Sequence, residues 1–339
     1  MRVIIPMAGI GTRLKPHTLT VPKPLTLVAG KSIVQRLVEE IVKVVGQKVT
    51  DIGFIIGPTS KGFPDDTSMK LIEIAERFGA KGSVYVQEEA LGTAHAIYQA
   101  RNLLEGNVVV AFADTLFKAD FVLDNQYDGV IWVKKVENPK EFGVVKLNNG
   151  IISDFVEKPQ EFVSDLAIIG IYYFKNGDLL KAEIDHIIDN NVRGKGSEFQ
   201  LTDALEAMKC KGNKFVPGTV LDWMDSGNKE ATIETNKKTL EYEQLEGKNM
   251  IAKNMQALNS NIIPPCYIGE NVVIEQSTIG PYVSIGDNTI VKNSSIVNSL
   301  IQTHTQIINA SLQNSMIGNH VYYNGNYESV SLGDFSVLE

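Results

Sequence analysis

Cysteine, long apolar runs and an excess of positive charge are all scarce in this chain of 339 residues. The two cysteines, Cys210 and Cys266, cannot make a disulfide framework, and neither lies in a Cys-x-x-Cys pair or near paired histidines, as a metal site would require. We therefore expect two buried thiols. No stretch of about 18 apolar residues suggests a membrane span. The apolar N-terminal run is broken at Pro6, which argues against a signal peptide.

Acidic residues outnumber basic ones by 40 to 32, so the formal net charge is -8. This balance argues against duplex DNA, RNA or an anionic membrane as the main partner. Any nucleotide that binds is therefore expected to be small. The 43% of hydrophobic residues can bury a large core, and the length suffices for two domains. A cytoplasmic enzyme fits these properties best.

A glycine-containing loop with fixed cations follows the first apolar segment. It reads Ala8-Gly9-Ile10-Gly11-Thr12-Arg13-Leu14 and continues to Pro22-Lys23-Pro24. Glycines let backbone N–H groups close around anionic oxygens, and guanidinium and ammonium groups add charge suited to phosphate. The loop lacks the third glycine of a dinucleotide fingerprint, and the first glycine of a Walker loop is also missing before Gly30-Lys31-Ser32. A glycine turn that only connects a strand to a helix is the structural alternative.

The pattern along the first 112 residues alternates between strands and helices. Ser32 is a plausible N-cap for a helix with apolar residues at three- and four-residue spacing, ending at Gly46. We predict strands at 52–56, 83–87 and 108–112, and helices at 68–78 and 91–104. This alternation indicates a parallel, doubly wound α/β sheet. Sites in such sheets lie beyond the carboxyl ends of the strands, just after Gln87 and Phe112.

The glycine loop resembles the signature of the sugar-1-phosphate nucleotidylyltransferases, which include glucose-1-phosphate thymidylyl- and uridylyltransferases. The resemblance lies in Gly9-x-Gly11-Thr12-Arg13-Leu14 and Pro22-Lys23-Pro24-Leu25. It implies the mixed, mainly parallel sheet of the nucleotide-diphospho-sugar transferases. It also implies Mg²⁺-dependent transfer of a nucleotidyl group from a nucleoside triphosphate to a sugar 1-phosphate. In that reaction, Arg13 and Lys23 would be catalytic, and the nucleotide would contact Ala8, Gly9, Gly11 and Thr12.

Two further segments resemble the base and metal sites of that family. Gln87 to Ala96 is similar to the base-recognition segment, which assigns the nucleobase to Gln87 and Gly92. We expect His95 to be a packed or capping residue of the following helix. Ala113-Asp114 stands where the family has Gly-Asp, and Trp223-Met224-Asp225-Ser226-Gly227 resembles its Trp-x-Asp-x-Gly. The resemblance makes Asp114 and Asp225 the Mg²⁺ ligands, although a lone aspartate after a strand is often a turn residue.

A predicted hairpin carries the segment that resembles the sugar site. Asn148-Asn149-Gly150 is a strong hairpin turn signal between two short strands. The flanking Phe142-Gly143-Val144-Val145 and Glu157-Lys158-Pro159 resemble the family's Tyr-Gly-Val-Val and Glu-Lys-Pro. The resemblance assigns the sugar to Glu157, Gly143 and Gly170, and the sugar phosphate to Lys158. The asparagine that usually precedes Gly-Ile-Tyr is replaced by Ile168 or Ile169, so recognition of the sugar is expected to be unusual.

The remaining catalytic-domain segments are read as structural. Ser197 and Gln200 stand at capping-box spacing and predict a helix start. Residues 228–245 are expected to form a polar helix that leaves the catalytic domain, which we place at residues 1–245.

From Ile263 onward, aliphatic residues recur at steps of five or six. Grouped in threes, the steps give 17 residues from Ile268 to Ile285 and 16 from Ile285 to Ile301. Three faces per coil predict a parallel β-helix, and this run resembles the left-handed β-helix of several nucleotidylyltransferases. We place the linker and a short β-helix of about four coils at residues 246–339, and expect it to support a homo-oligomer.

Two other functions remain possible from the sequence. An acyltransferase in the β-helix would need a histidine base, for which His304 and His320 are the candidates. A non-catalytic regulator that binds nucleotide sugars is the second, but the proposed catalytic residues are all present. The nucleobase and the sugar stay open, because one methyl group distinguishes dTTP from UTP and is worth only about 1–3 kcal/mol. We favour dTTP or UTP with glucose 1-phosphate.

Overall fold

The computed structural model describes residues 1–9, 11–119, 123, 126–325 and 331–338. The chain divides into two compact units, each assembled from two separate segments. The first unit comprises Met1–Gly9 and Leu37–Trp223, and the second comprises Ile10–Arg36 and Met224–Glu339. Within the described ranges, no helix is both long enough and apolar enough to cross a membrane.

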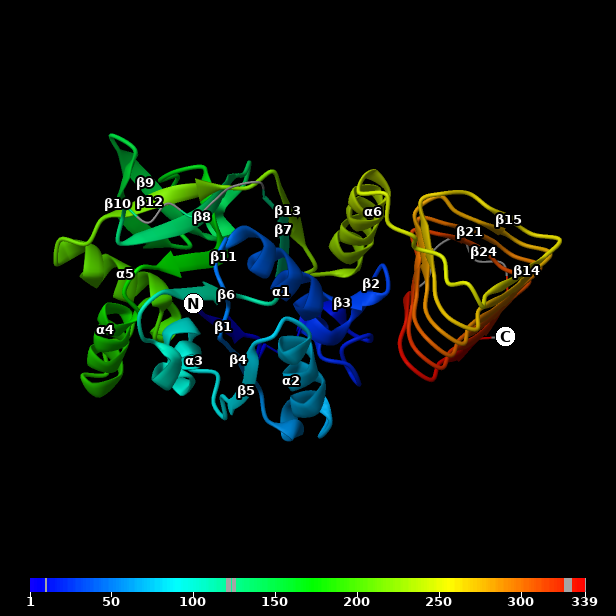
Figure 1. Ribbon diagram of the computed structural model, residues 1–339, viewed down its shortest axis with the longest axis horizontal. Helices are drawn as coiled ribbons and strands as arrows, with labels where there is room; N and C mark the ends of the chain where they lie inside the picture. Colours follow the sequence, from blue (N-terminus) through cyan, green and yellow to red (C-terminus); the bar gives the residue numbers. More distant parts are fainter. Residues whose placement is uncertain (10, 120–122, 124–125, 326–330, 339) are drawn as a thin grey trace. The chain divides into compact units, whose positions relative to one another are not determined.

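A nine-stranded mixed sheet organises the first unit (Figure 1). Its strands are β1 (Arg2–Pro6), β4 (Asp51–Ile56), β5 (Lys81–Val86), β6 (Val108–Ala111), β8 (Gly129–Lys135), β9 (Gly143–Asn148), β10 (Ile151–Glu157), β11 (Leu166–Phe174) and β12 (Phe215–Thr219). They run in the order β10-β9-β11-β6-β1-β4-β5, with β8 beside β11 and β12 beside β8. Strands β6, β1, β4 and β5 are parallel, and β11 begins the antiparallel half. The predicted doubly wound, mixed α/β sheet is confirmed.

Apolar packing explains why these segments form the sheet. Strands β1 and β6 are runs of β-branched residues buried on both faces, as expected of strands at the centre of an α/β sheet. Two shorter ladders join β7 (Thr115–Lys118) to β13 (Asp222–Asp225), and β2 (Leu27–Val28) to β3 (Lys31–Ser32). The helices are α1 (Ile33–Val44), α2 (Thr67–Arg77), α3 (Thr93–Gln99), α4 (Gly177–Asp189), α5 (Leu201–Cys210) and α6 (Lys229–Leu245).

Local turn and cap signals are confirmed at two places. The Ser32 hydroxyl accepts a hydrogen bond from the Gln35 amide at 3.3 Å, so the predicted cap of α1 is present. In the hairpin between β9 and β10, Asn149 has φ 50° and Gly150 has φ 80°. Two successive positive φ angles match the twist of the flanking strands, which is why asparagine and glycine occupy this turn.

Three local expectations are wrong. Ser197 does not cap α5, because it lies in a 3-10 turn with φ 58°. The helix begins at Leu201, whose amide donates at 2.8 Å to the hydroxyl of Thr93. The predicted helix at 91–104 is shorter, since α3 ends at Gln99 and a separate 3-10 turn follows. Cys210 is exposed, while Cys266 is buried as expected.

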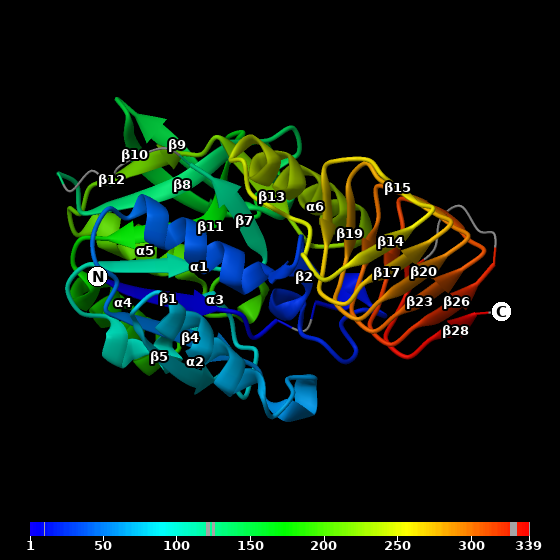
Figure 2. The same cartoon turned by 45° about the vertical axis from the view of Figure 1, so that its right-hand side comes forward.

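Three parallel sheets form the β-helix of the second unit, and Figure 2 shows β14, β17, β20, β23, β26 and β28 side by side. Those strands are β14 (Gln256–Leu258), β17 (Val273–Glu275), β20 (Ile290–Lys292), β23 (Gln306–Ile308), β26 (Tyr322–Asn324) and β28 (Val337–Leu338). The second sheet contains β15 (Asn261–Ile262), β18 (Thr278–Ile279), β21 (Ser295–Val297) and β24 (Ser311–Gln313). The third contains β16 (Cys266–Ile268), β19 (Val283–Ile285), β22 (Leu300–Ile301), β25 (Met316–Ile317) and β27 (Ser331–Leu332).

The predicted repeat is confirmed by the register of these strands. Ile268 pairs with Ile285, Ile285 with Ile301, and Ile301 with Ile317, and all four are buried in one apolar column. Asparagines at the corners of the coils adopt positive φ angles, for example 48° at Asn293. The side-chain amide of Asn293 donates to Asn309 Oδ1 on the next coil at 3.2 Å. The coils begin at β14, ahead of the predicted start at Ile263, because the weakly apolar first coil carries little periodic signal.

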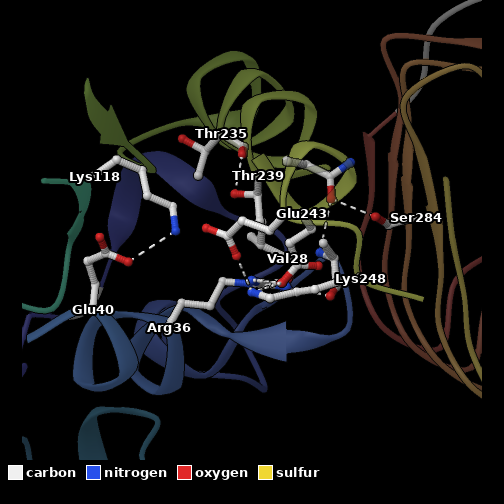
Figure 3. A network of polar contacts seen from close by, with 12 residues as sticks. Val28, Arg36, Glu40, Lys118, Thr235, Thr239, Glu243, Lys248 and Ser284 are labelled. Carbon is white, nitrogen blue, oxygen red and sulfur yellow. Dashed lines mark hydrogen bonds and ion pairs between the residues drawn. The ribbon is translucent and has the colours of Figure 1, made fainter. Parts of the chain in front are cut away.

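A buried ion pair ties the N-terminal segment of the second unit to α6 (Figure 3). Arg36 Nη1 lies 2.9 Å from Glu243 Oε1, and both side chains are 8% exposed. The same guanidinium donates from Nε to the Val28 carbonyl at 2.7 Å, and from Nη2 to the Ala29 carbonyl. Several fixed donors on one planar group are what arginine offers and lysine does not.

We predict that Arg36→Ala lowers the free energy of unfolding by about 3–5 kcal/mol, because it leaves a buried carboxylate and two carbonyls without their main donor. Lys43→Ala is the control, since Lys43 is 60% exposed and lies 4.0 Å from Glu40. Glu40 is buried but keeps Lys118 at 3.0 Å as a partner, so loss of the long contact to the exposed Lys43 should cost only about 0–1 kcal/mol. Urea denaturation of both variants provides the measurement, and equal losses would contradict the structural role of Arg36.

Candidate active site

The glycine loop is shaped by one left-handed residue in the second unit. Gly11 has φ 65° and ψ 43°, and it precedes a 3-10 turn over Thr12–Leu14. Its carbonyl accepts a hydrogen bond from the Thr18 hydroxyl at 2.8 Å. A Cβ at this position would lie 3.0 Å from the Cβ of Lys23, so glycine is required by both conformation and space.

The predicted phosphate contacts differ in burial. Thr12 and Arg13 are exposed at the surface of the second unit, whereas Lys23 is 7% exposed. Ala8 and Gly9 follow β1 at the end of the first segment of the first unit. A Cβ on the exposed Gly9 would meet nothing within 4 Å. No packing demand explains that glycine, which leaves an open backbone suited to a ligand.

The predicted base contacts lie together after β5 in the first unit. Gln87 is 6% exposed, and its Nε2 donates to the Gly92 carbonyl at 3.2 Å. Gly92 has φ 116°, and a Cβ there would lie 2.4 Å from the carbonyl oxygen of Phe199. Phe199 in turn donates its amide to the Leu91 carbonyl at 2.8 Å. The segment before α5 therefore presses directly on Gly92.

His95 holds the Gln87 amide, a role that sequence reasoning missed. Its Nδ1 lies 3.1 Å from Gln87 Nε2. Burial lowers the pKa of His95, so the neutral ring is favoured at pH 7 and Nδ1 can accept. The sequence spacing of these two residues could have indicated the contact. Gln87 directly follows β5 and His95 lies in the first turn of α3, so the two side chains can meet.

The carboxylates of Asp114 and Glu157 act electrostatically on Tyr172 in the first unit. Asp114 is exposed just beyond β6, where the Ala113 amide donates to the Pro6 carbonyl at 3.2 Å. Burial raises the pKa of Tyr172 well above its usual range, and the carboxylates of Glu157 and Asp114 raise it further. The Tyr172 phenol therefore stays neutral and can donate a hydrogen bond. A carboxylate predicted for the metal and one predicted for the sugar thus both influence this one tyrosine.

The predicted sugar contacts lie on the hairpin beside α5. Glu157 pairs with Gly143 across the ladder, and a Cβ on Gly143 would lie 3.0 Å from Glu157 Oε2. Thr202 donates its hydroxyl to the same oxygen at 3.3 Å. Lys158 is half-exposed, and its Nζ lies 3.8 Å from Glu157 Oε1. A side chain at Gly143 would therefore crowd this carboxylate, which would have to shift slightly.

Gly170 marks an irregularity inside β11. It has φ 83°, and the register of β11 against β8 shifts between Ile168 and Tyr172. A Cβ on Gly170 would lie 3.4 Å from the Cβ of Phe112, which is ordinary contact. The positive φ explains why glycine stands here.

Trp223 joins three of the predicted motifs. Its Nε1 donates at 2.8 Å to the hydroxyl of Thr115, the residue that follows Asp114. Its ring meets Phe142 edge-on, with centroids 5.3 Å apart. Sequence reasoning recognised Phe142 and Trp223 only as motif residues, and local spacing gave no sign of their contact.

Asp225 lies in the second unit, and its motif has a steric explanation. A Cβ on Gly227 would lie 2.8 Å from Asp225 Oδ2. The Asp225 carbonyl accepts from the Thr235 hydroxyl at 2.6 Å. Asn228 then caps α6 by accepting from the Ala231 amide at 2.8 Å. Glycine two residues after the aspartate therefore leaves the carboxylate exposed at the surface of this unit.

Mg²⁺ suits this donor set. Asp114 and Asp225 offer exposed oxygen ligands, and Mg²⁺ commonly takes one or two carboxylates together with water and substrate phosphates. Across the described residues, no three His, Cys, Asp or Glu side chains gather as a metal site.

The sequence of this chain is similar to a known protein family and to several known enzymes. A family model described as nucleotidyl transferase matches residues 2–242. A bifunctional protein GlmU of Methanococcus vannielii is 30% identical over 81% of this chain and 61% of its own length. The chain thus spans less than two thirds of that relative. A glucose-1-phosphate thymidylyltransferase of Streptomyces griseus is 28% identical over 95% of this chain and 93% of its own length.

One solved structure shares the fold. It is a UDP-glucose pyrophosphorylase complexed with UDP-glucose, with a TM-score of 0.56 at 23% identity. The match covers 71% of this chain and 98% of the solved chain.

We predict that Gly92→Ala destabilises the protein more than Gly106→Ala does. Both glycines have positive φ, 116° and 61°, but only Gly92 would place a Cβ against backbone, while Gly106 has nothing within 4 Å. Forcing atoms into such a contact costs about 1–3 kcal/mol beyond the conformational strain. Urea midpoints of the two variants measure the difference. A smaller loss for Gly92→Ala would show that the Phe199 segment yields freely.

Proposed function

Because this chain belongs to the nucleotidyl transferase family, we propose that it transfers a nucleotidyl group from dTTP or UTP to a sugar 1-phosphate, with glucose 1-phosphate as the favoured acceptor. The products are a nucleoside diphosphate sugar and pyrophosphate. The observation that carries this proposal is the family match over residues 2–242, which includes every residue assigned below. The similar thymidylyltransferase supports the choice of substrates.

The proposed reaction needs no enzyme nucleophile. An anionic oxygen of the sugar phosphate attacks the α-phosphorus, and the bond from that phosphorus to the oxygen bridging to the β-phosphorus breaks in line. Pyrophosphate carries away the electron pair, so no proton transfer is required. Catalysis then rests on positioning and on stabilising negative charge.

The cations and the open backbone would divide this work. Arg13 stabilises the leaving pyrophosphate, and Lys23 lies beside the triphosphate. Lys158, on the hairpin, aligns the incoming sugar phosphate. The backbone around Ala8, Gly9, Gly11 and Thr12 binds phosphate oxygens. Guanidinium suits the two oxygens of one phosphate, whereas ammonium acts as a point charge.

The Gln87 amide supports a pyrimidine imide as the base. Its Nε2 donates to the Gly92 carbonyl and to His95 Nδ1, which uses both of its hydrogens. The amide oxygen then remains as the group offered to the base. Thymine and uracil present a ring N–H to such an acceptor, whereas the same ring position of cytosine is an acceptor. Gly92 would contact the base through its backbone.

Asp114 and Asp225 would hold Mg²⁺ through their carboxylates. The ion, when bound, supplies positive charge that neutralises the phosphates and lowers the repulsion between the two substrates. For the acceptor, Glu157 accepts from sugar hydroxyls, and Gly143 and Gly170 keep the sugar side of the site free of side chains. Tyr172 adds a neutral hydrogen-bond donor, since burial and the charges of Glu157 and Asp114 raise its pKa.

The remaining expectations stay proposals. We place the catalytic domain at 1–245 and the β-helix with its linker at 246–339, and we propose a cytoplasmic homo-oligomer. Neither nucleic acid polymers nor membranes are expected as partners. For the acyltransferase alternative, His304 and His320 stack at 4.9 Å on one β-helix corner, and His320 stacks on Phe335 at 4.8 Å. Packing of these three rings explains the two histidines, so no observation favours acyl transfer. An assay with acetyl-CoA and glucosamine 1-phosphate would test that activity.

We predict that a panel of nucleoside triphosphates, each tested with several sugar 1-phosphates, gives pyrophosphate release with dTTP or UTP.

Asp225→Asn should lower this turnover in the presence of Mg²⁺ by at least about a hundredfold, because a neutral amide is a poor ligand for a hard cation. Asp66→Asn serves as control, since Asp66 is an exposed partner of Lys70. Turnover with ATP or GTP alone would refute the assignment of Gln87 and Gly92 to a pyrimidine base. A fully active Asp225→Asn variant would refute the assignment of Asp225 as a metal ligand.

We predict that the KM for the nucleoside triphosphate rises as the pH falls below the ordinary histidine pKa of about 6.5. The pKa of His95 is lowered in the folded protein, so the bond from Gln87 survives until the ring is protonated at acid pH and Nδ1 becomes a donor. His95→Phe should raise that KM at pH 7 and remove this dependence. His186→Phe, at an exposed histidine, should keep it. A wild-type KM for His95→Phe at pH 7 would contradict the positioning role.

A further inference from the structure

We infer that the outer face of the β-helix positions the phosphate-binding segment, so that Leu300, Met316 and Gln302 act as positioning residues for the nucleoside triphosphate. This inference rests on the proposed function for its catalytic consequence. The contacts that carry it all lie within the second unit, which contains both residues 10–36 and the β-helix.

An apolar cluster links the residue next to Arg13 to two coils. Leu14 is 1% exposed and forms a cluster with Ile233 of α6, Leu300 of β22 and Met316 of β25. Leu300 and Met316 are register partners on adjacent coils. Their chain neighbours Ile301 and Ile317 belong to the β-helix core instead. Since side chains alternate along a strand, Leu300 and Met316 face out of the coils toward Leu14.

Polar side chains bind the backbone farther along the segment. Asn236 Oδ1 accepts from the Ala29 amide at 3.1 Å and from the Ser284 hydroxyl at 2.7 Å, so one α6 side chain bridges the segment and β19. Gln302 Nε2 donates to the Leu27 carbonyl at 3.1 Å. These bonds leave the segment no freedom to slide along the β-helix face.

The segment also contacts the first and the last coils of the β-helix, through the backbone of Gly30 and the side chain of His17. Gly30 has φ 80°, and a Cβ there would lie 2.1 Å from Cζ of Tyr267 on β16. His17 Nε2 lies 2.8 Å from the Ser331 hydroxyl on β27. Burial lowers the pKa of His17 to about 4, so the neutral ring makes this bond at pH 7.

The segment is thus held directly after Arg13 and on both sides of Lys23. Leu14 follows Arg13 directly, and Lys23 lies between the contacts at His17 and Leu27. The 3-10 turns that carry both cations are only three residues each and cannot hold their own position. A change on the β-helix face should therefore alter binding of the triphosphate without touching the sugar contacts on the hairpin.

The test compares two leucines of the β-helix. Leu300→Ala opens a cavity behind Leu14, whereas Leu312→Ala, at a 2% exposed leucine of β24, opens one inside the coils. We expect Leu300→Ala to raise the KM for the nucleoside triphosphate about tenfold and to speed amide hydrogen exchange in residues 11–30. The KM for sugar 1-phosphate should stay within about twofold. Leu312→Ala should lower the melting temperature at least as much and leave both KM values within about twofold.

An equal rise of the triphosphate KM in both variants, or no rise in Leu300→Ala, would overturn the inference. If Leu300→Ala fails to fold, Gln302→Ala replaces it, with the exposed Gln313→Ala on β24 as its control. Hydrogen exchange separates the two proposals. A wild-type protein inactive on every triphosphate refutes the proposed function, while faster exchange confined to residues 11–30 in Leu300→Ala still supports the positioning role.

Discussion

The backbone of residues 27–29 takes several of its hydrogen bonds from side chains elsewhere in the second unit. Apart from the two-residue strands β2 and β3, this region has no ladder or helix to pair with. Buried carbonyls without partners cost free energy comparable to a lost hydrogen bond. Gln302 serves the Leu27 carbonyl, and Arg36 serves those of Val28 and Ala29. The β-helix and the start of α1 therefore complete a segment that could not be stable alone.

Strong periodicity made most of the fold predictable from the sequence. The buried runs of β4 and β6, the Asn149-Gly150 turn and the repeat of the coils all follow local rules, and these were predicted correctly. The failures involve partners far away in the chain. The start of α5 depends on the Thr93 hydroxyl, 108 residues from Leu201, whereas Ser197 offered only a matching local spacing. No window of a few residues contains that information.

The same distinction applies to the candidate site. Glycine positions could be read as motif residues, but their reasons are steric and distant. Gly92 is glycine because Phe199 crosses it, and a side chain at Gly143 would crowd Glu157. The contacts of Trp223 with Thr115 and Phe142 also join parts of the chain that are far apart in the sequence. Such contacts depend on the order of strands in the sheet, which a motif search does not supply.

Catalysis by positioning gives these supporting contacts their importance. When an enzyme supplies no nucleophile, its rate depends on how firmly charged groups and substrate are held, since a displacement of about 1 Å can cost a hundredfold. In this protein the direct contacts proposed for the nucleotide lie on loops, and hydrogen bonds or apolar contacts hold each loop in place. His95 holds Gln87, Thr18 holds the carbonyl of Gly11, and the outer face of the β-helix holds Leu14. Precision at the site therefore originates in the helices and coils that surround it.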